Sequence, residues 1–235
     1  TPASGDYLAV ASMTFLAGSS AQVVTIVLYV GGSPIARSER QFDVEGSIFS
    51  QDYTVSTSGK VSPTGSQAVE LRYRVNTGSA TANQRALTLF PKESADFSEV
   101  SETADTASLT QTSDTQLGNL PSTPGAGTYL LVFSCSGEAT TVGGTADRIH
   151  LTVYVGGSST GYAHTHRRYM VEASLSANLS DVTFMIACKV TPTAGQAVQI
   201  MYRVDDATHP FVVHERTLTL MKVKSADIFE ISDTV

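Results

Sequence analysis

A ten-residue strand pattern occurs twice in this chain. Residues 66–75 read SQAVELRYRV, and residues 195–204 read GQAVQIMYRV. In both copies apolar residues recur at every second position, which is the period of a β-strand that buries one face. The apolar positions stay within one chemical type, while most positions on the other face differ. The repeat therefore predicts a duplicated module whose core contains the apolar face of this strand.

The duplication extends over nearly the whole chain. Both copies open on similar segments, TPASGDYL at Thr1 and TPGAGTYL at Thr123, and both contain YVGGS, a turn signature with glycines that can take positive φ. The offset between the copies grows in steps, and each step falls between apolar segments, where loops tolerate insertions. The segments rich in Val, Ile, Thr, Tyr and Phe are predicted strands: residues 7–16, 22–30, 35–44, 52–61, 67–75, 84–90 and 97–101, then 129–135, 149–155, 164–171, 181–190, 197–204, 215–221 and 228–232.

These patterns predict an all-β protein of two tandem antiparallel β-sandwich (jelly-roll) domains joined by a linker. Residues 1–102 form the first predicted domain and residues 123–235 the second. Residues 103–122, TADTASLTQTSDTQLGNLPS, are rich in Ser and Thr and poor in apolar residues. We expect this segment to be an extended linker, because it has little to bury.

Composition excludes two classes of partner. The net charge is −7 and neither copy is basic, whereas a nucleic-acid backbone requires a concentrated positive surface. The longest apolar run, near residues 23–30, is much shorter than a membrane span, and no signal or transit segment is visible. Charged residues make up 16% of the chain, below the roughly 25% of a typical soluble domain, so the predicted surface is unusually neutral.

The two cysteines, Cys135 and Cys188, both lie in the second copy. A disulfide framework would be expected in both copies, so we interpret them as free thiols packed in apolar strands. A bridge between them stays an alternative, because the sequence gives no distance between the two residues.

No motif in the chain identifies a catalytic or metal site. His164 and His166 could begin a zinc site, but no third ligand is evident, and His209 and His214 offer no better one. The adjacent acids Asp205 and Asp206 fit a turn better than a glycosidase pair, which needs two carboxylates facing across a cleft. We therefore predict no catalytic residue, no cofactor and no metal.

Polar residues that recur in both copies are the strongest candidate site residues. We interpret them as a structural ion-pair cluster within each module, with a contact between protomers as the alternative. They are Arg74 with Arg203, Arg85 with Arg216, and Asp96 with Asp227 inside a shared SAD tripeptide.

The succession TYLLVFS, LTVYVGGS, GQAVQIMYRV and RTLTLMKV resembles the jelly-roll modules of tailed-phage virion proteins. These are capsid decoration proteins and head or tail fibre tips, and they are similar in topology to the heads of the tumour-necrosis-factor and complement type. The resemblance covers about 100 residues in each copy, and the tandem duplication departs from the usual single head.

The resemblance implies a structural, non-enzymatic virion protein, assembled in the host cytoplasm, that decorates or cements the outer capsid surface as a homotrimer. Its implied partners are the major capsid protein or other virion proteins. The main alternative is a fibre or spike head that binds a receptor or glycan through the longer loops of the second copy, near residues 137–147 and 205–214. A secreted hydrolase on a sandwich fold is a third alternative, and it would need convergent acids in a cleft.

Overall fold

Antiparallel β-sheets account for nearly all of the regular structure. The structure is a computed structural model that describes residues 1–17, 22–44, 52–92, 97–118, 120–139, 147–160, 162, 165–171 and 182–224. Within these ranges the strands form four sheets, and a short 3-10 turn, η1 (Ala36–Ser38), precedes β4 (Arg40–Val44). The prediction of an all-β fold of the antiparallel sandwich type is confirmed.

Most predicted strands are present with changes at their ends, but the strand predicted at residues 35–44 is wrong in its first half, because Ala36–Ser38 form η1 and β4 begins at Arg40. The first half contains β1 (Tyr7–Ala17), β2 (Gln22–Val30), β3 (Ser33–Pro34), β4 (Arg40–Val44), β5 (Asp52–Val61), β6 (Val69–Val75), β7 (Ala80–Pro91) and β8 (Phe97–Glu102). The rest contains β9 (Thr115–Gln116), β10 (Tyr129–Ala139), β11 (Asp147–Val155), β12 (Arg167–Val171), β13 (Val182–Val190), β14 (Val198–Val204) and β15 (Phe211–Lys222). The strand predicted at residues 228–232 lies outside the described residues.

The strand orders of the first and second halves match. The first half has one sheet of order β5-β1-β7 and a second in which β2 pairs with β3, β4 and β6. The second half has sheets of order β13-β10-β15-β8 and β12-β11-β14-β9. The repeated strand of the sequence is β6 in one copy and β14 in the other, and it pairs with β2 and β11 respectively. β8 and β9 are additions to the second pair of sheets that the first pair lacks among its described strands.

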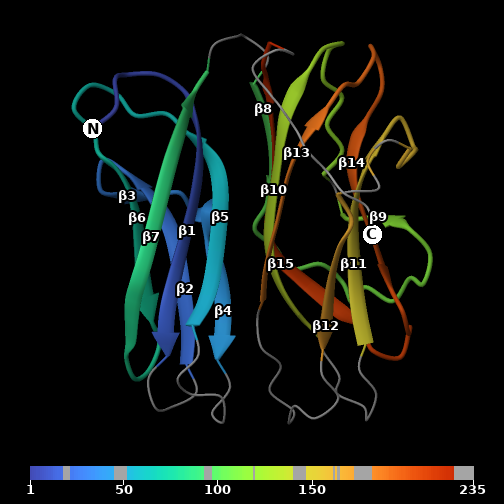
Figure 1. Ribbon diagram of the computed structural model, residues 1–235, viewed down its shortest axis with the longest axis horizontal. Helices are drawn as coiled ribbons and strands as arrows, with labels where there is room; N and C mark the ends of the chain where they lie inside the picture. The colour runs from blue at the N-terminus through green and yellow to red at the C-terminus, as the bar shows by residue number, and fades with distance from the viewer. Residues whose placement is uncertain are drawn as a thin grey trace.

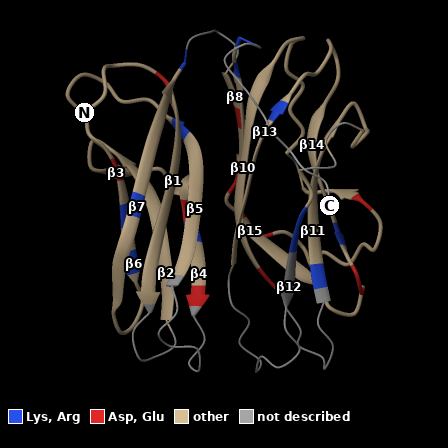
Figure 2. Ribbon diagram, in the orientation of Figure 1, with Lys and Arg blue, Asp and Glu red and all other residues tan. Residues whose placement is uncertain are grey.

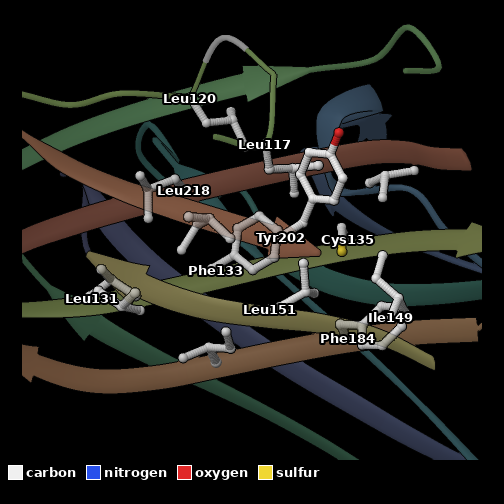
Figure 3. Packing of buried hydrophobic residues seen from close by; sticks show 14 of the residues in the cluster. Leu117, Leu120, Leu131, Phe133, Cys135, Ile149, Leu151, Phe184, Tyr202 and Leu218 are labelled. Carbon is white, nitrogen blue, oxygen red and sulfur yellow. The ribbon is translucent and has the colours of Figure 1, made fainter. Parts of the chain in front are cut away.

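Each pair of sheets encloses a hydrophobic core. In the first pair, Met13 and Phe15 of β1 pack against Val24 and Ile26 of β2, since alternate residues of each strand face inward. The core of the second pair is larger and includes Phe133, Leu151 and Tyr202 (Figure 3). The YVGGS turns follow β2 and β11, and all four of their glycines have positive φ, as the sequence predicts.

The segment at residues 103–122 covers the second core. Within it β9 pairs with β14, and isolated bridges join Leu109 to Phe211 and Ser122 to Val198. Leu109, Leu117 and Leu120 are buried in that core. The expectation that this segment has little to bury is wrong, because three leucines placed along two sheet edges are enough to anchor a polar segment. The domain boundaries themselves stay a prediction.

The two sandwiches lie side by side, with the β5-β1-β7 sheet facing the sheet of β10 and β15 (Figure 1). Leu8 of β1, Val132 of β10 and Met221 of β15 form a small apolar cluster between these sheets. β8 lies with the second sandwich although it directly follows the last strand of the first. The two sandwiches are therefore joined both by packing and by β8, a strand that follows the first sandwich in sequence but pairs in a sheet of the second.

Replacing Leu117 by alanine is expected to lower the free energy of unfolding by about 2–4 kcal/mol, because its fully buried side chain leaves a cavity. Urea denaturation measures this change. The matched control is Thr112→Ala, an exposed position of the same segment, which should change stability by less than about 0.5 kcal/mol. Equal small effects of both changes would show that the segment is not packed.

Candidate interaction surface

A buried arginine links the two sandwiches. Arg40, at the start of β4, is fully buried, and its guanidinium donates hydrogen bonds to the backbone oxygen (2.8 Å) and Oγ (2.7 Å) of Ser134 on β10. It also donates to the carbonyl oxygens of Arg37 (3.0 Å) and Glu39 (2.5 Å). Burial lowers the pKa of Arg40 to about 10, still well above neutral pH, so the group stays charged.

Further polar contacts surround Arg40. Ser58 of β5 hydrogen-bonds Ser134 Oγ through both its backbone nitrogen (3.2 Å) and its hydroxyl (3.0 Å). Glu99 of β8 accepts hydrogen bonds from the Arg37 side chain and from the Lys60 backbone nitrogen. The facing surfaces of the two sandwiches are thus joined by directional bonds, and these fix their relative position better than apolar contact alone.

The two open edges of the first sandwich expose apolar side chains whose counterparts are covered in the second. Tyr73 on β6 is 43% exposed, whereas Tyr202, its counterpart on β14, is 6% exposed and lies next to β9. Phe90 on β7 is 36% exposed, whereas Met221 on β15 is 6% exposed and pairs with Phe97 of β8. Among the described strands, β6 and β7 end their sheets. We call the outer sides of β6 and β7, with Tyr73 and Phe90, the open edges.

The recurring arginines of the sequence lie on different sheets and do not bond to one another. Arg74 on β6 forms an ion pair with Glu39, and Arg203 on β14 pairs with Asp114 at 2.9 Å. Arg85 is exposed on β7. Asp96 and Asp227 lie outside the described residues, so the role of this set stays a prediction. Lys and Arg are interspersed with Asp and Glu on both sandwiches (Figure 2).

Arg216 holds the segment that crosses the second core. Its side chain is buried and donates hydrogen bonds to the backbone oxygens of Ala104 (2.8 Å) and His214 (3.1 Å). The guanidinium also lies against Gly118, which has a φ of +56°, so a larger residue there would be strained and crowded. Arg85, its sequence counterpart, lies on the open β7 edge.

A chain of polar contacts that the sequence did not reveal joins two histidines to an aspartate. His150 on β11 hydrogen-bonds His166 through Nδ1 (2.8 Å) and Asp205 Oδ1 through Nε2 (2.7 Å). With both rings neutral, the bonds are satisfied if His166 donates to His150 and His150 donates to Asp205. Arg148 reaches the other oxygen of Asp205 at 3.3 Å. The copies differ here, since Thr25 stands where the second copy has His150, and no sequence motif marks the position.

The environment of this group disfavours a charge on His166. Partial burial and then the neighbouring His150 lower the pKa of His166, with Arg203 and Arg168 adding to the effect and Asp114 opposing it. Partial burial opposes ionisation of Asp205, yet the hydrogen bond from His150 and the nearby Arg148 leave the pKa of Asp205 lowered. In the described part of the chain, no group of three or more His, Cys, Asp or Glu side chains is arranged to hold a metal ion. His164 lies outside it.

Both cysteines are buried thiols that form no disulfide, as predicted. Burial raises the pKa of the Cys135 thiol to about 12, so it stays protonated and unreactive at neutral pH. No helix among the described residues is long and apolar enough to cross a membrane.

Comparisons with known proteins give only distant structural similarity. No protein-family model matches the sequence, and no curated protein matches it. Among solved structures, the infectious bursal disease virus VP2 subviral particle aligns at 6% identity with a TM-score of 0.37, over 93% of this chain and 58% of that one. The Gx strain of the same virus aligns at 7% identity with a TM-score of 0.36, over 95% and 59% of the two chains. The chain thus spans less than two thirds of these proteins, and at such scores the likeness carries no functional argument.

Replacing Arg40 by methionine is expected to lower the free energy of unfolding by about 2–4 kcal/mol, because the Ser134, Arg37 and Glu39 carbonyls lose a buried donor. Chemical denaturation measures this cost. Arg167→Met is the matched control: this sequence counterpart of Arg40 is exposed, so its change should stay within about 0.5 kcal/mol. If both variants lose the same stability, Arg40 does not anchor the sandwiches.

The free energy of unfolding is expected to fall as the pH is lowered from 7.5 to 5.5. The folded-state pKa of His166 lies below its unfolded value of about 6.5, so the unfolded chain binds more protons and gains relative stability as the pH drops. Asp205, whose folded-state pKa is also lowered, acts in the same direction nearer pH 4.

Urea denaturation at the two pH values tests this expectation. His166→Gln should make the loss of stability on acidification smaller. His209→Gln removes a histidine outside the group, so this variant should lose as much stability on acidification as the parent chain. An unchanged pH dependence in His166→Gln would contradict the assignment.

Proposed function

We propose that the chain is a structural, non-catalytic virion protein that decorates or cements the outer capsid surface and forms a homotrimer. The observation that carries the proposal is the pair of open edges on a rigidly joined double sandwich. The second sandwich covers the equivalent apolar residues with β8 and β9, which indicates that such an edge is stable only when covered.

The β6 edge is the proposed capsid contact. Tyr73 is an exposed aromatic residue, and aromatic side chains supply much of the energy of protein interfaces. On the neighbouring strand Tyr29 lies under the guanidinium of Arg72, 4.3 Å from the ring centroid, and Arg72 also pairs with Glu70. These contacts hold the polar side chains of the edge in place before binding, which reduces the entropy lost on association.

A receptor- or glycan-binding head is the second candidate function. It is favoured by the loop after β14, where Asp206 accepts hydrogen bonds from the backbone nitrogen and the hydroxyl of Thr208, both at 2.8 Å. Asp205 beside it is held by His150 and Arg148. Ordered, exposed carboxylates of this kind are suitable partners for sugar hydroxyls.

Binding of the purified chain to capsids that lack it tests the proposal. The chain is expected to co-sediment with the capsids and to raise the temperature at which they disrupt. Tyr73→Ser should weaken this binding by about tenfold, since a central aromatic contributes on the order of 1–2 kcal/mol or more. Leu16→Ser is the matched control, because Leu16 is also exposed but lies on β1, away from the β6 edge.

Two outcomes would contradict the proposal. Binding to glycans or cells without affinity for capsids would favour the receptor-binding head. A single monomeric species at high micromolar concentration, measured by light scattering, would contradict the homotrimer.

A further inference from the structure

A row of basic side chains crosses three neighbouring strands on the outer face of the second sandwich. His150 on β11 is paired with Arg168 on β12 and with Arg203 on β14. Directly paired residues point to the same face of a sheet, and the neighbours Ile149 and Leu151 are buried in the core. The three basic residues therefore share the face that points away from the core. Figure 2 shows blue segments on the adjacent strands β11 and β12.

His166 lies against this row, and one of its ring nitrogens is open. The rings of His166 and His150 are nearly parallel, at 4°, and their centroids are 5.0 Å apart. When both rings are neutral, His166 Nε2 donates to His150 Nδ1, and His150 Nε2 donates to Asp205. His166 is exposed, and its Nδ1 has no hydrogen-bond partner in the described part of the chain. A proton added at Nδ1 therefore gives the ring a second donor and leaves the existing bonds in place.

The acids near the row are already paired with other arginines. Asp114 binds Arg203 at 2.9 Å, and Asp205 lies 3.3 Å from Arg148. Arg168 is exposed, and no acidic side chain among the described residues forms an ion pair with it. These five residues therefore leave an excess of one positive charge on this face, in a chain whose net charge is −7.

The first copy has the same framework without this excess. Its strands β4, β2 and β6 place Gln41, Thr25 and Arg74 in the corresponding row. Glu39 stands at the position of His166 and forms an ion pair with Arg74. The first copy thus neutralises the single arginine of its row. In the second copy a histidine replaces the acid, and a second arginine is added to the row.

The surroundings of the row favour a polar ligand over a protein partner. Guanidinium groups bind carboxylates and other oxyanions through paired N–H donors. Protein interfaces are anchored mainly by large side chains that become buried on binding. Among the described residues the exposed large apolar side chains are those of Leu16, Tyr73 and Phe90, and all three lie in the first sandwich. A sugar with an acidic group matches the excess positive charge and needs no such anchor.

We propose that Arg168, Arg203 and His166 bind the sulfate or carboxylate group of an acidic glycan. The inference rests on the second candidate function, glycan binding, and names its ligand class. Arg168 supplies a guanidinium without a counter-charge. Arg203 donates through Nη1 to Asp114, and its other N–H groups have no side-chain acceptor among the described residues.

The charges around His166 couple its protonation to binding. Partial burial, then His150 and the two arginines Arg203 and Arg168, lower the pKa of His166, whereas Asp114 raises it. A bound oxyanion offsets the repulsion from the neighbouring cations and accepts a hydrogen bond from the protonated ring. Binding and protonation therefore strengthen one another.

Titration with defined oligosaccharides tests the proposal. A sulfated, heparin-derived oligosaccharide and a sialylated oligosaccharide are added to the purified chain in a calorimeter, with the desulfated and desialylated sugars as matched controls. The salt concentration is about 0.15 M, so that long-range attraction is screened. At least one acidic sugar is expected to bind, and its neutral form should bind about tenfold more weakly or not at all. Binding of only one acidic sugar would support the site and identify the oxyanion.

Arg168→Gln is expected to weaken this binding about tenfold, because a charge-assisted hydrogen bond is lost. Glutamine is the residue that the first copy has at this position, so the fold should tolerate it. Arg85→Gln is the matched control, since it removes the same charge from an exposed arginine of the first sandwich and should leave binding unchanged. Arg168→Lys, which keeps the charge, should lose less affinity than Arg168→Gln. Urea denaturation checks that each variant is folded.

The affinity for the acidic sugar should rise as the pH is lowered from about 7.5 to about 5.5, because the oxyanion favours protonated His166. His166→Gln should remove most of this rise, and His209→Gln should retain it. An unchanged pH dependence in His166→Gln would contradict the proposed site.

Other results would also overturn the inference. Equal binding of the acidic and neutral sugars would keep the second candidate function but contradict this site. Equal weakening by Arg168→Gln and Arg85→Gln would show that the sugar responds only to the overall charge. Binding of no sugar would refute both the site and the second candidate function, whereas capsid binding is measured separately and tests the first.

Discussion

The rest of the structure depends on the pairing of β8 with β15. This strand is the last of the first copy, and its position in the second sheet links the sandwiches through backbone hydrogen bonds that neither could form alone. The segment that follows is then placed over the second core, where Leu117 and Leu120 are buried and Arg216 holds the backbone of Ala104. A β-sandwich must pair or cover its edges, and here the covering strand is supplied by the preceding copy.

The hydrogen bonds of the buried Arg40 with Ser134, Arg37 and Glu39 are a second constraint on how the two sandwiches are placed. A buried guanidinium loses its hydration, and this loss is offset only where enough acceptors surround it. Ser134 and the carbonyl oxygens of Arg37 and Glu39 supply them, although Arg40 Nε has no hydrogen-bond partner in the described part of the chain. Loss of the arginine would leave these buried acceptors without a donor, so the contacts of Arg40 hold the two sandwiches in one relative position. A fixed relative position is what a subunit of a larger assembly requires.

The sequence predicted the strands well and their partners less well. β2 and β5 have the predicted bounds, because alternation and turn residues are local signals. The choice of sheet edge by β8 is not local: its alternating residues fit either sandwich, and only the three-dimensional arrangement decides between them. Likewise Arg40 and Arg167 are equivalent in sequence, yet one is buried and the other exposed, so the anchor was missed. His150 was missed because its partners, His166 and Asp205, lie far from it in sequence.

Amide hydrogen exchange of the whole chain tests the central claim, forward donation of a strand, most directly. Backbone amides of β8 that pair with β15 should exchange as slowly as those of β15 itself, because the two would open only together. The amides of Leu109 and Leu117, which donate to Phe211 and Ile200, should share this protection. Rapid exchange across residues 97–117 while β15 stays protected would show that the segment is a free linker, and would contradict the account.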